Sequence, residues 1–292
     1  MGSQALIAGL IFALFATTCS AQVNDQRGFY ERFQINWAGE NIWDNAWAKE
    51  VQMQLVPTGG ASIASYNSYL YGHFSARLKL VANESSGVVT ALYLTSYGPN
   101  WDEIDFEFLG NETGQPYVLH TNLFVNGNGS REQRIFLWFD PTLDFHTYAV
   151  VWNHEQILWL VDDIPIRVHK NREAWHPNSF PHFRPMVVAA SIFEASTWAT
   201  QGGRVPIKWE FAPFKITFSN FTFDACTVWN NDTTPCNTEY WNNPWESWNY
   251  TNLDWAQAGQ LNWVKNSFTV YDYCTDRVRF PVEPAECVYN AV

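Results

Sequence analysis

Three carboxylates stand at every second position of one short segment: Glu103, Asp105 and Glu107. Side chains of a β-strand alternate between its two faces, so this spacing predicts a strand with all three acids on one face. The residues that alternate with them are large and apolar: Ile104, Phe106 and Phe108. An ordinary half-buried strand alternates in the same way, but its polar face seldom gathers like charges, because neighbouring carboxylates repel each other. The pattern therefore favours a catalytic strand over a solvated one.

Clustered carboxylates suit a reaction that needs one ionised and one protonated carboxyl group side by side. Retaining glycosidases hold two such groups roughly 5–5.5 Å apart, and inverting glycosidases hold them roughly 6.5–9.5 Å apart. Glu103 and Glu107 lie four residues apart on a strand, so their Cα atoms are expected roughly 13 Å apart, and long side chains can close to either separation. Calcium binding is the alternative use of three acids, but no Gly-containing ligand loop accompanies them. We expect no metal and no cofactor.

The composition disfavours one class of partner and favours another. The 292 residues carry a formal net charge of −12 without any Lys/Arg cluster, so binding to nucleic acid through its phosphates is not expected. Charged residues make up only 16% of the chain, whereas Trp (16), Tyr (13) and Phe (21) are abundant. Aromatic rings stack on the C–H faces of sugars, so this composition favours a carbohydrate ligand, although an aromatic β-rich core would give the same counts.

The first residues have the pattern of a secretory signal. Leu6 to Phe15 is a nearly continuous apolar run, and the small residues Cys19-Ser20-Ala21 follow it. This predicts a signal peptide over residues 1–21, with cleavage before Gln22. The run is too short to span a bilayer and no later segment reaches 18 apolar residues, so we expect a secreted protein without a membrane anchor.

Secretion changes the interpretation of the cysteines. The mature chain keeps four of them: Cys226, Cys236, Cys274 and Cys287. Disulfides are expected rather than zinc, because no C-x-x-C pair or nearby pair of His is present. Four cysteines allow three pairings, of which 226–236 with 274–287 closes the shortest loops. Six N-x-[ST] sequons agree with export: Asn83, Asn111, Asn128, Asn220, Asn231 and Asn249.

Short runs of period two, broken by Gly, Pro and Asn, fill residues 33–223. They predict an all-β protein, an antiparallel β-sandwich of the jelly-roll, concanavalin-like type over residues 22–224. Besides the acidic segment, the expected strands cover 68–81, 88–97, 117–125, 131–139, 148–153, 157–162, 164–166, 185–192 and 214–223. Residues 225–292 are rich in Trp, Asn and Pro, with a weak helical pattern over 253–265 and strand character over 268–273. We expect them to form a disulfide-held extension packed on the sandwich.

The acidic segment resembles the active-site strand of a known family. Residues 102–111, DEIDFEFLGN, match that strand of the plant xyloglucan endotransglucosylase/hydrolases, in glycoside hydrolase family 16. Further matches follow in order through nearly all of the mature chain: 114–117 (GQPY), 121–122 (TN), 131–134 (REQR), 137–141 (LWFDP), 161–163 (VDD), 166–167 (IR), 198–200 (WAT) and 273–277 (YCTDR).

The resemblance implies a jelly roll with a long open cleft and a retaining reaction on a β-1,4-glucan. Glu103 would be the nucleophile, Glu107 the general acid/base and Asp105 a helper, and Asn111 would be a glycosylation site. It implies binding of the polysaccharide substrate by a further group of residues: His120, Asn122, Arg131, Gln133, Trp198, Gly203 and Arg277. From the residues alone, Asn122, Arg131 and Trp198 serve equally well as turn or packing residues.

The sequence departs from the family pattern at four places. Trp101 occupies a position where the family usually has His, His120 one where it has Gln, and Phe193 one where it commonly has a cleft Trp. Residues 58–65 lack the usual Gly-Ser-Gly-Phe-rich sequence. These positions lie where the family binds its substrate, so we expect the protein to accept xyloglucan and also at least one other β-glucan as donor or acceptor. Three functions compete: a monomeric cell-wall enzyme that transfers glucan chains, a mainly hydrolytic enzyme, and a non-catalytic lectin-like sandwich. Three retained carboxylates argue against the lectin.

Overall fold

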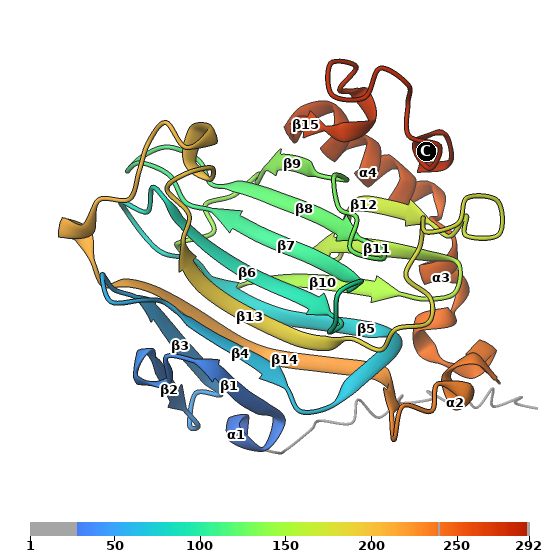
Figure 1. Ribbon diagram of the computed structural model, residues 1–292. Helices are drawn as coiled ribbons and strands as arrows, with labels where there is room; N and C mark the ends of the chain where they lie inside the picture. Colours follow the sequence, from blue (N-terminus) through green and yellow to red (C-terminus); the bar gives the residue numbers. More distant parts are fainter. Residues whose placement is uncertain (1–27, 239, 291–292) are drawn as a thin grey trace, which may run out of the picture.

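The computed structural model describes residues 28–238 and 240–290, so the signal peptide predicted over 1–21 lies outside the described residues. The described chain forms two antiparallel β-sheets that pack face to face. Figure 1 shows β6, β7, β8 and β13 of one sheet in front of β10 and β11 of the other. The predicted all-β sandwich is therefore confirmed.

The larger sheet contains eight strands in the order β1-β4-β13-β6-β7-β8-β9-β15. Their bounds are β1 Phe33–Trp37, β4 Ala61–Ser65, β6 Val88–Thr95, β7 Glu103–Leu109, β8 Val118–Phe124, β9 Gln133–Phe136, β13 Val187–Glu194 and β15 Thr269–Asp272. The smaller sheet contains seven strands in the order β12-β11-β10-β5-β14-β3-β2. Their bounds are β2 Ile42–Asn45, β3 Glu50–Leu55, β5 Ser68–Lys79, β10 His146–Trp152, β11 Gln156–Val161, β12 Ile164–Lys170 and β14 Phe214–Val228.

Short helices connect these strands or follow them. The α-helices are α1 Phe29–Arg32, α2 Thr234–Asn237, α3 Trp248–Thr251, α4 Trp255–Phe268 and α5 Cys287–Asn290. Single 3-10 turns cover Gly39–Asn41, Thr200–Gly202, Trp209–Phe211, Tyr240–Asn242, Pro244–Glu246 and Tyr273–Thr275. The weak helical pattern over 253–265 corresponds to α4, which begins with a capping box in which Asp254 and Gln257 bond each other's backbone N–H.

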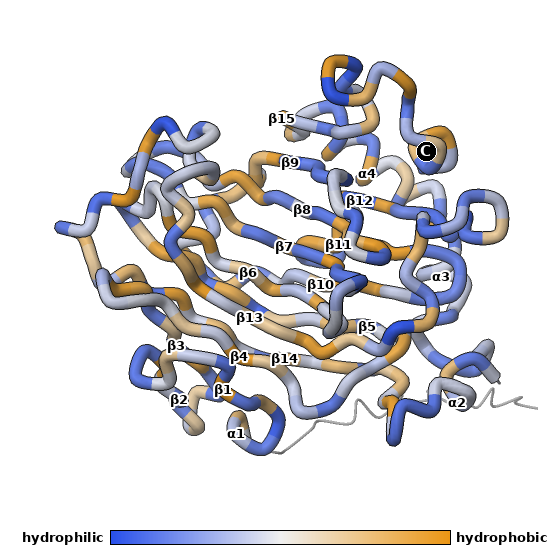
Figure 2. Tube along the Cα trace, viewed as in Figure 1, coloured by the Kyte–Doolittle hydropathy of each residue, from blue (hydrophilic) through white to orange (hydrophobic). Residues whose placement is uncertain are grey.

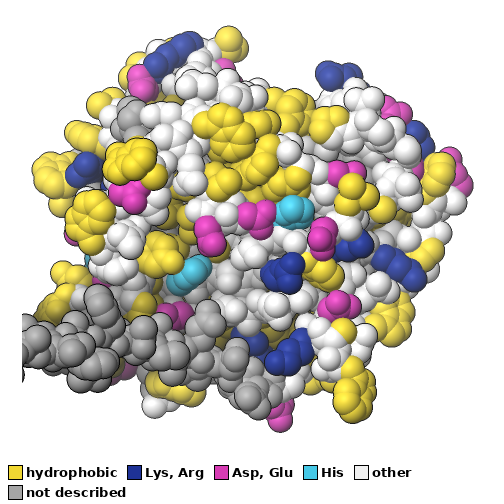
Figure 3. All heavy atoms as spheres, turned by 180° about the vertical axis from the view of Figure 1, so that it is seen from behind, with side chains coloured by type: hydrophobic (Ala, Val, Ile, Leu, Met, Phe, Trp, Pro, Cys, Tyr) yellow, Lys and Arg dark blue, Asp and Glu magenta, His cyan; other side chains and the backbone are white. Residues whose placement is uncertain are grey.

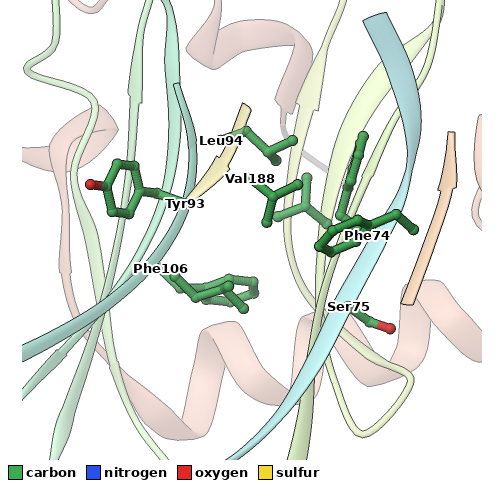
Figure 4. A pocket seen from close by; sticks show the side chains of 9 residues that line it. Phe74, Ser75, Tyr93, Leu94, Phe106 and Val188 are labelled. Atoms are coloured by element: carbon green, nitrogen blue, oxygen red, sulfur yellow. The ribbon is translucent and has the colours of Figure 1, made fainter. Parts of the chain in front are cut away.

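The core lies between the two sheets and follows from the period-two pattern. On β7 the apolar residues Ile104, Phe106 and Phe108 are buried and belong to one cluster with residues of the opposite sheet. Figure 2 shows hydrophobic and hydrophilic positions alternating along β7. A void of about 10 Å³ remains in this core beside Phe74 and Phe106, as Figure 4 shows. This volume is at the lower limit for one water molecule, so the void is a packing defect rather than a binding site.

The C-terminal segment is joined to β14 by one disulfide, cross-linked within itself by a second, and held to the sandwich by hydrogen bonds. Cys226 pairs with Cys236 and Cys274 with Cys287, which confirms the pairing with the shortest loops. β15 extends the larger sheet beside β9, and α4 packs against β12. The side-chain amide of Asn153, between β10 and β11, donates to two carbonyl oxygens of the segment, at 2.9 and 3.0 Å. The segment therefore has no separate core and completes the sheet.

Charged groups are dispersed over the surface. Figure 3 views the molecule from behind and shows Lys and Arg side chains scattered among acidic and apolar ones. Within residues 28–238 and 240–290, no helix combines the length and the apolar character that crossing a membrane requires. The same residues contain no cluster of three or more His, Cys, Asp or Glu arranged to hold a metal ion.

Candidate active site

The three acids of β7 lie on the outer face of the larger sheet, opposite the core. We call this face, defined by Glu103, Asp105 and Glu107 with their cross-strand neighbours, the carboxylate face. Strand pairing places one neighbour on each side of every acid. Glu103 lies between Thr95 and Phe124, Asp105 between Tyr93 and Asn122, and Glu107 between Ala91 and His120. The sequence predicted the shared face of the acids, and the sheet adds the neighbours.

Burial and neighbouring groups act differently on the pKa values of Asp105 and Glu103. Asp105 is buried, and burial together with the charges of Glu103 and Glu107 raises its pKa well above the usual range. In its protonated form, Asp105 can donate a hydrogen bond to Glu103. Burial also raises the pKa of Glu103, but hydrogen bonds with Thr95 and Asp105 act in the opposite direction and favour its ionised form. An ionised carboxylate supported by a neighbouring donor has the properties of a nucleophile.

Glu107 has the properties of a general acid. Burial, and then the charge of Glu103, raise the pKa of Glu107 to about 7, whereas Arg134 lowers it. A carboxyl group with this pKa is protonated in mildly acidic solution and can still give up its proton. Its side chain is 21% exposed, which leaves a path for a substrate oxygen.

Three contacts that the sequence did not reveal hold β7 in place. The indole N–H of Trp159, a buried residue of β11, donates to the carbonyl oxygen of Asp105 at 3.1 Å. Just before the strand, the buried carboxylate of Asp102 accepts from Arg184 at 3.1 Å and from the backbone N–H of Asn126 at 2.7 Å. All three contacts join residues more than 20 positions apart, so no local pattern indicates them.

His120 lies beside Glu107, and Trp198 lies beside His120. His120 is buried, and its Nε2 lies 3.9 Å from Oε2 of Glu107. The Trp198 ring stands edge-on to the imidazole, with 6.3 Å between ring centroids, and remains partly exposed. Trp198 therefore leaves part of an aromatic ring accessible beside His120.

Asn122 and Arg131 make structural hydrogen bonds near the site. Oδ1 of Asn122 accepts from the backbone N–H of Leu123 and of Arg131. The Arg131 guanidinium donates from Nε to Glu286 at 2.9 Å and from its other nitrogens to the carbonyl oxygens of Asn128 and Asn178. These contacts fix the turn after β8, and they link it to the C-terminal segment.

The pairing of β8 with β9 puts Arg134, and not Gln133, on the carboxylate face. Gln133 pairs with Thr121, whose hydroxyl accepts from the interior Arg167, so both lie on the inner face. Arg134 pairs with His120 and lies over the ring of Tyr271, 5.3 Å from its centroid. The sequence analysis missed Arg134, although it is the next residue of the same motif, because a shift of one residue exchanges the faces of a strand.

Gly203 and Arg277 do not touch the carboxylates. Gly203 ends the 3-10 turn after Trp198 with a φ of 84°, and a Cβ atom there would lie 2.2 Å from the carbonyl oxygen of Thr197. Gly203 therefore supports the backbone that carries Trp198. Arg277 is an exposed residue that pairs with Glu283 at 2.6 Å within the C-terminal segment. Asn111 follows β7 and donates from Nδ2 to the carbonyl oxygen of Pro116.

Gly203→Ala is expected to lower kcat/KM about tenfold or more, because the added methyl group must displace the Thr197–Trp198 peptide. Gly202→Ala is the matched control: its φ is 71°, but the added Cβ meets nothing within 4 Å. Both variants carry the strain of an L-residue at positive φ, about 1–2 kcal/mol. Kinetic constants on a glucan substrate and thermal unfolding of both variants test this, and an equal loss of activity in the two would contradict it.

The double variant Cys274→Ser/Cys287→Ser is expected to loosen the turn beside the site as well as the C-terminus. Glu286, the partner of Arg131, precedes Cys287, and Arg279 pairs with Glu132 just before β9. Removing this cross-link should reduce stability by about 2–4 kcal/mol. Hydrogen exchange should then rise in residues 128–136, and the matched variant Cys226→Ser/Cys236→Ser should leave that stretch protected.

Two family models and several relatives match the sequence of this chain. Residues 29–211 match the family model for Glycosyl hydrolases family 16, and residues 236–287 match that for the Xyloglucan endo-transglycosylase (XET) C-terminus. The chain is 42% identical over 279 residues to the probable xyloglucan endotransglucosylase/hydrolase protein 7 of Arabidopsis thaliana, covering 95% of this chain and 94% of that protein. It is 43% identical over 292 residues to xyloglucan endotransglucosylase protein 6 of Diospyros kaki, covering 96% and 95% of the two chains.

Solved structures share the sandwich at low sequence identity. The Bacillus licheniformis beta-glucanase superposes with a TM-score of 0.54 at 22% identity, covering 66% of this chain and 91% of that chain. The laminarinase from Rhodothermus marinus superposes with a TM-score of 0.53 at 23% identity, covering 66% and 82%. These two likenesses show the fold, whereas the family models and the plant relatives extend through the C-terminal segment. The chain therefore belongs to glycosyl hydrolase family 16 and, within it, to the xyloglucan endotransglucosylase/hydrolases.

Proposed function

We propose that this enzyme cleaves the β-1,4-glucan backbone of xyloglucan with retention and transfers the new end to another glucan chain. The observation that carries the proposal is the unequal environment of the three acids. Burial and the charges of both Glu residues raise the pKa of Asp105 well above its usual range, hydrogen bonds with Thr95 and Asp105 oppose the rise for Glu103, and the pKa of Glu107 is raised to about 7. Glu103 attacks the anomeric carbon as Glu107 protonates the leaving oxygen. Glu107 then takes the proton of the acceptor hydroxyl, and the acceptor oxygen displaces Glu103.

Transfer requires that a sugar hydroxyl reach the glycosyl-enzyme before water does. Positioning a bound acceptor gives very high effective concentrations, so acceptor binding beside Glu107 is sufficient in principle. The exposed face of Trp198 is our candidate for this acceptor contact. Arg134 is our candidate for a polar contact, because its Nε is buried and has no hydrogen-bond partner within the described residues.

We further propose that the enzyme acts outside the cell, in the plant cell wall, as a monomer glycosylated at Asn111. The apolar N-terminal run and the two disulfides support export. Asn111 lies in a surface loop and is partly exposed, which is compatible with an attached glycan.

One reaction distinguishes transfer from hydrolysis. The purified protein is incubated with polymeric xyloglucan and a labelled xyloglucan oligosaccharide, and the products are separated by size exclusion. Label that moves into the polymer fraction supports transfer, and shrinkage of the polymer with new reducing ends and no incorporated label supports hydrolysis. A polymer that binds the protein without changing size would favour the lectin-like alternative.

Substrate range is expected to be wider than xyloglucan alone. Trp101 stacks on Phe124, the β8 neighbour of Glu103, and Phe193 lies on β13 where the family pattern has a Trp. Changes of stacking or hydrogen bonding are each worth about 0.5–1.5 kcal/mol, so several together can alter preference by roughly one to three decades. Initial rates on xyloglucan, mixed-linkage glucan and soluble cellulose derivatives test this, with background rates on all but xyloglucan as the contrary result.

A further inference from the structure

His120 has an unusual environment on the carboxylate face. Its side chain is 6% exposed, and neither ring nitrogen has a hydrogen-bond partner among residues 28–238 and 240–290. A buried polar group without a partner is destabilising, so such groups are rare in folded proteins. The nearest charged atom across the strand pair is Oε2 of Glu107, at 3.9 Å from Nε2. This distance is too long for a hydrogen bond, but catalytic hydrogen bonds are often long in the free enzyme and shorten when substrate binds.

Burial and the charge of Arg134 disfavour protonation of the His120 ring. Burial, and then the charge of Arg134, lower the pKa of His120 to about 3. A neutral imidazole has one N–H donor and one acceptor nitrogen, so it can donate to a carboxylate without competing as an acid. Glu107 also faces other titratable groups: Glu103 and Asp105 on its own strand, and Arg134 with Glu132 on the side of β9. On β6 its partner is Ala91, and the nearest titratable residue of that strand, Tyr93, lies opposite Asp105. Among these side chains His120 is the direct cross-strand neighbour, and it has an unused donor.

We propose that His120 is a positioning residue for Glu107, and that its Nε2–H donates to the Glu107 carboxylate whenever that carboxylate is ionised. The inference rests on the proposed acid/base role of Glu107. In the first half-reaction the Glu107 proton moves to the leaving glycosidic oxygen, while a bond forms between Glu103 and the anomeric carbon. The ionised Glu107 then accepts the N–H of His120 until it takes a proton from the acceptor hydroxyl. His120 thus supports the form of Glu107 that acts as the base.

The test compares His120→Leu with His120→Gln, because only glutamine retains an N–H donor. The measured quantity is the pH dependence of kcat/KM for the donor glucan, whose alkaline limb reports the proton on Glu107. Losing the donor disfavours the ionised carboxylate, so the limb of His120→Leu should move upward by about one pH unit. His120→Gln should keep the wild-type limb. If both variants have a higher KM but the same alkaline limb of the pH profile as the wild type, His120 only binds substrate and the proposal is overturned.

A second readout does not depend on turnover. The side-chain carboxyl groups of Glu are labelled with carbon-13, and Glu107 is followed by NMR titration, with Glu107→Gln used for assignment. The proposal expects the pKa of Glu107 to be higher in His120→Leu than in the wild type and unchanged in His120→Gln. Equal values in all three proteins would refute it, even if the enzyme cleaves no xyloglucan. If the Glu107 pKa shifts as expected but the enzyme cleaves no xyloglucan, the proposed function is rejected and the positioning role of His120 stands. Circular dichroism checks that both variants fold, and His120→Asn is a further donor-retaining variant if His120→Gln does not.

Discussion

Replacing Glu103 with alanine is expected to lower glucan cleavage and transfer by at least about 10⁴-fold, because the reaction loses the atom that attacks the anomeric carbon. Binding of xyloglucan should remain within a few-fold of the wild type, since a nucleophile contributes in the transition state more than in the ground state. The measurements are initial rates from the labelled-oligosaccharide reaction and calorimetric binding of the polymer.

The matched control for Glu103→Ala is Glu50→Ala. Glu50 lies on β3 in the opposite sheet, away from the carboxylate face, so its removal should leave the rates unchanged. Added azide should restore slow cleavage in Glu103→Ala and give the α-glycosyl azide, because a small anion then attacks in place of the missing carboxylate. Rates near the wild-type level in Glu103→Ala would reject the proposed mechanism.

Replacing Glu107 with glutamine is expected to lower kcat/KM by about 10²–10⁴-fold, because the leaving oxygen loses its proton donor. The pH profile should change as well. Burial raises the pKa of Glu107 to about 7, so the wild type should lose activity as the pH rises through that value. The residual activity of Glu107→Gln should lack this alkaline decline, and an identical limb in both proteins would assign the acid to another group.

The same substitution is expected to raise stability at neutral pH. The pKa of Glu107 is higher in the folded chain, about 7, than its ordinary value of 4.5. Its contribution to stability is therefore complete below pH 4.5 and is lost as the pH rises through 7. Glu107→Gln avoids this loss and should become more stable than the wild type by about 2–3 kcal/mol above pH 7. Urea unfolding of both proteins at pH 4.5 and pH 8 measures the difference in their free energies of unfolding. A difference that does not grow with pH in favour of Glu107→Gln would contradict the prediction.

The sequence by itself determined which strand carries the three acids, and it determined the class of fold. Side chains alternate on a strand whatever surrounds it, so residues 103–108 place three acids on one face and three apolar residues on the other without tertiary information. The same period indicates most of the strands from β5 onward. It did not separate β1 to β4, which are short and lie between turns within residues 33–65.

Only the tertiary structure decided which neighbours the acids have and how their pKa values are shifted. Arg134, rather than Gln133, joins the carboxylate face because the register of β9 on β8 depends on pairing between strands and not on local pattern. Arg131 is held by Glu286, which is 155 positions away in the sequence. The raised pKa values of Asp105 and Glu107 need burial and the proximity of Glu103, and both arise when the sheet assembles. The residue types thus specify the available chemistry, whereas long-range packing shifts the pKa of each carboxyl group.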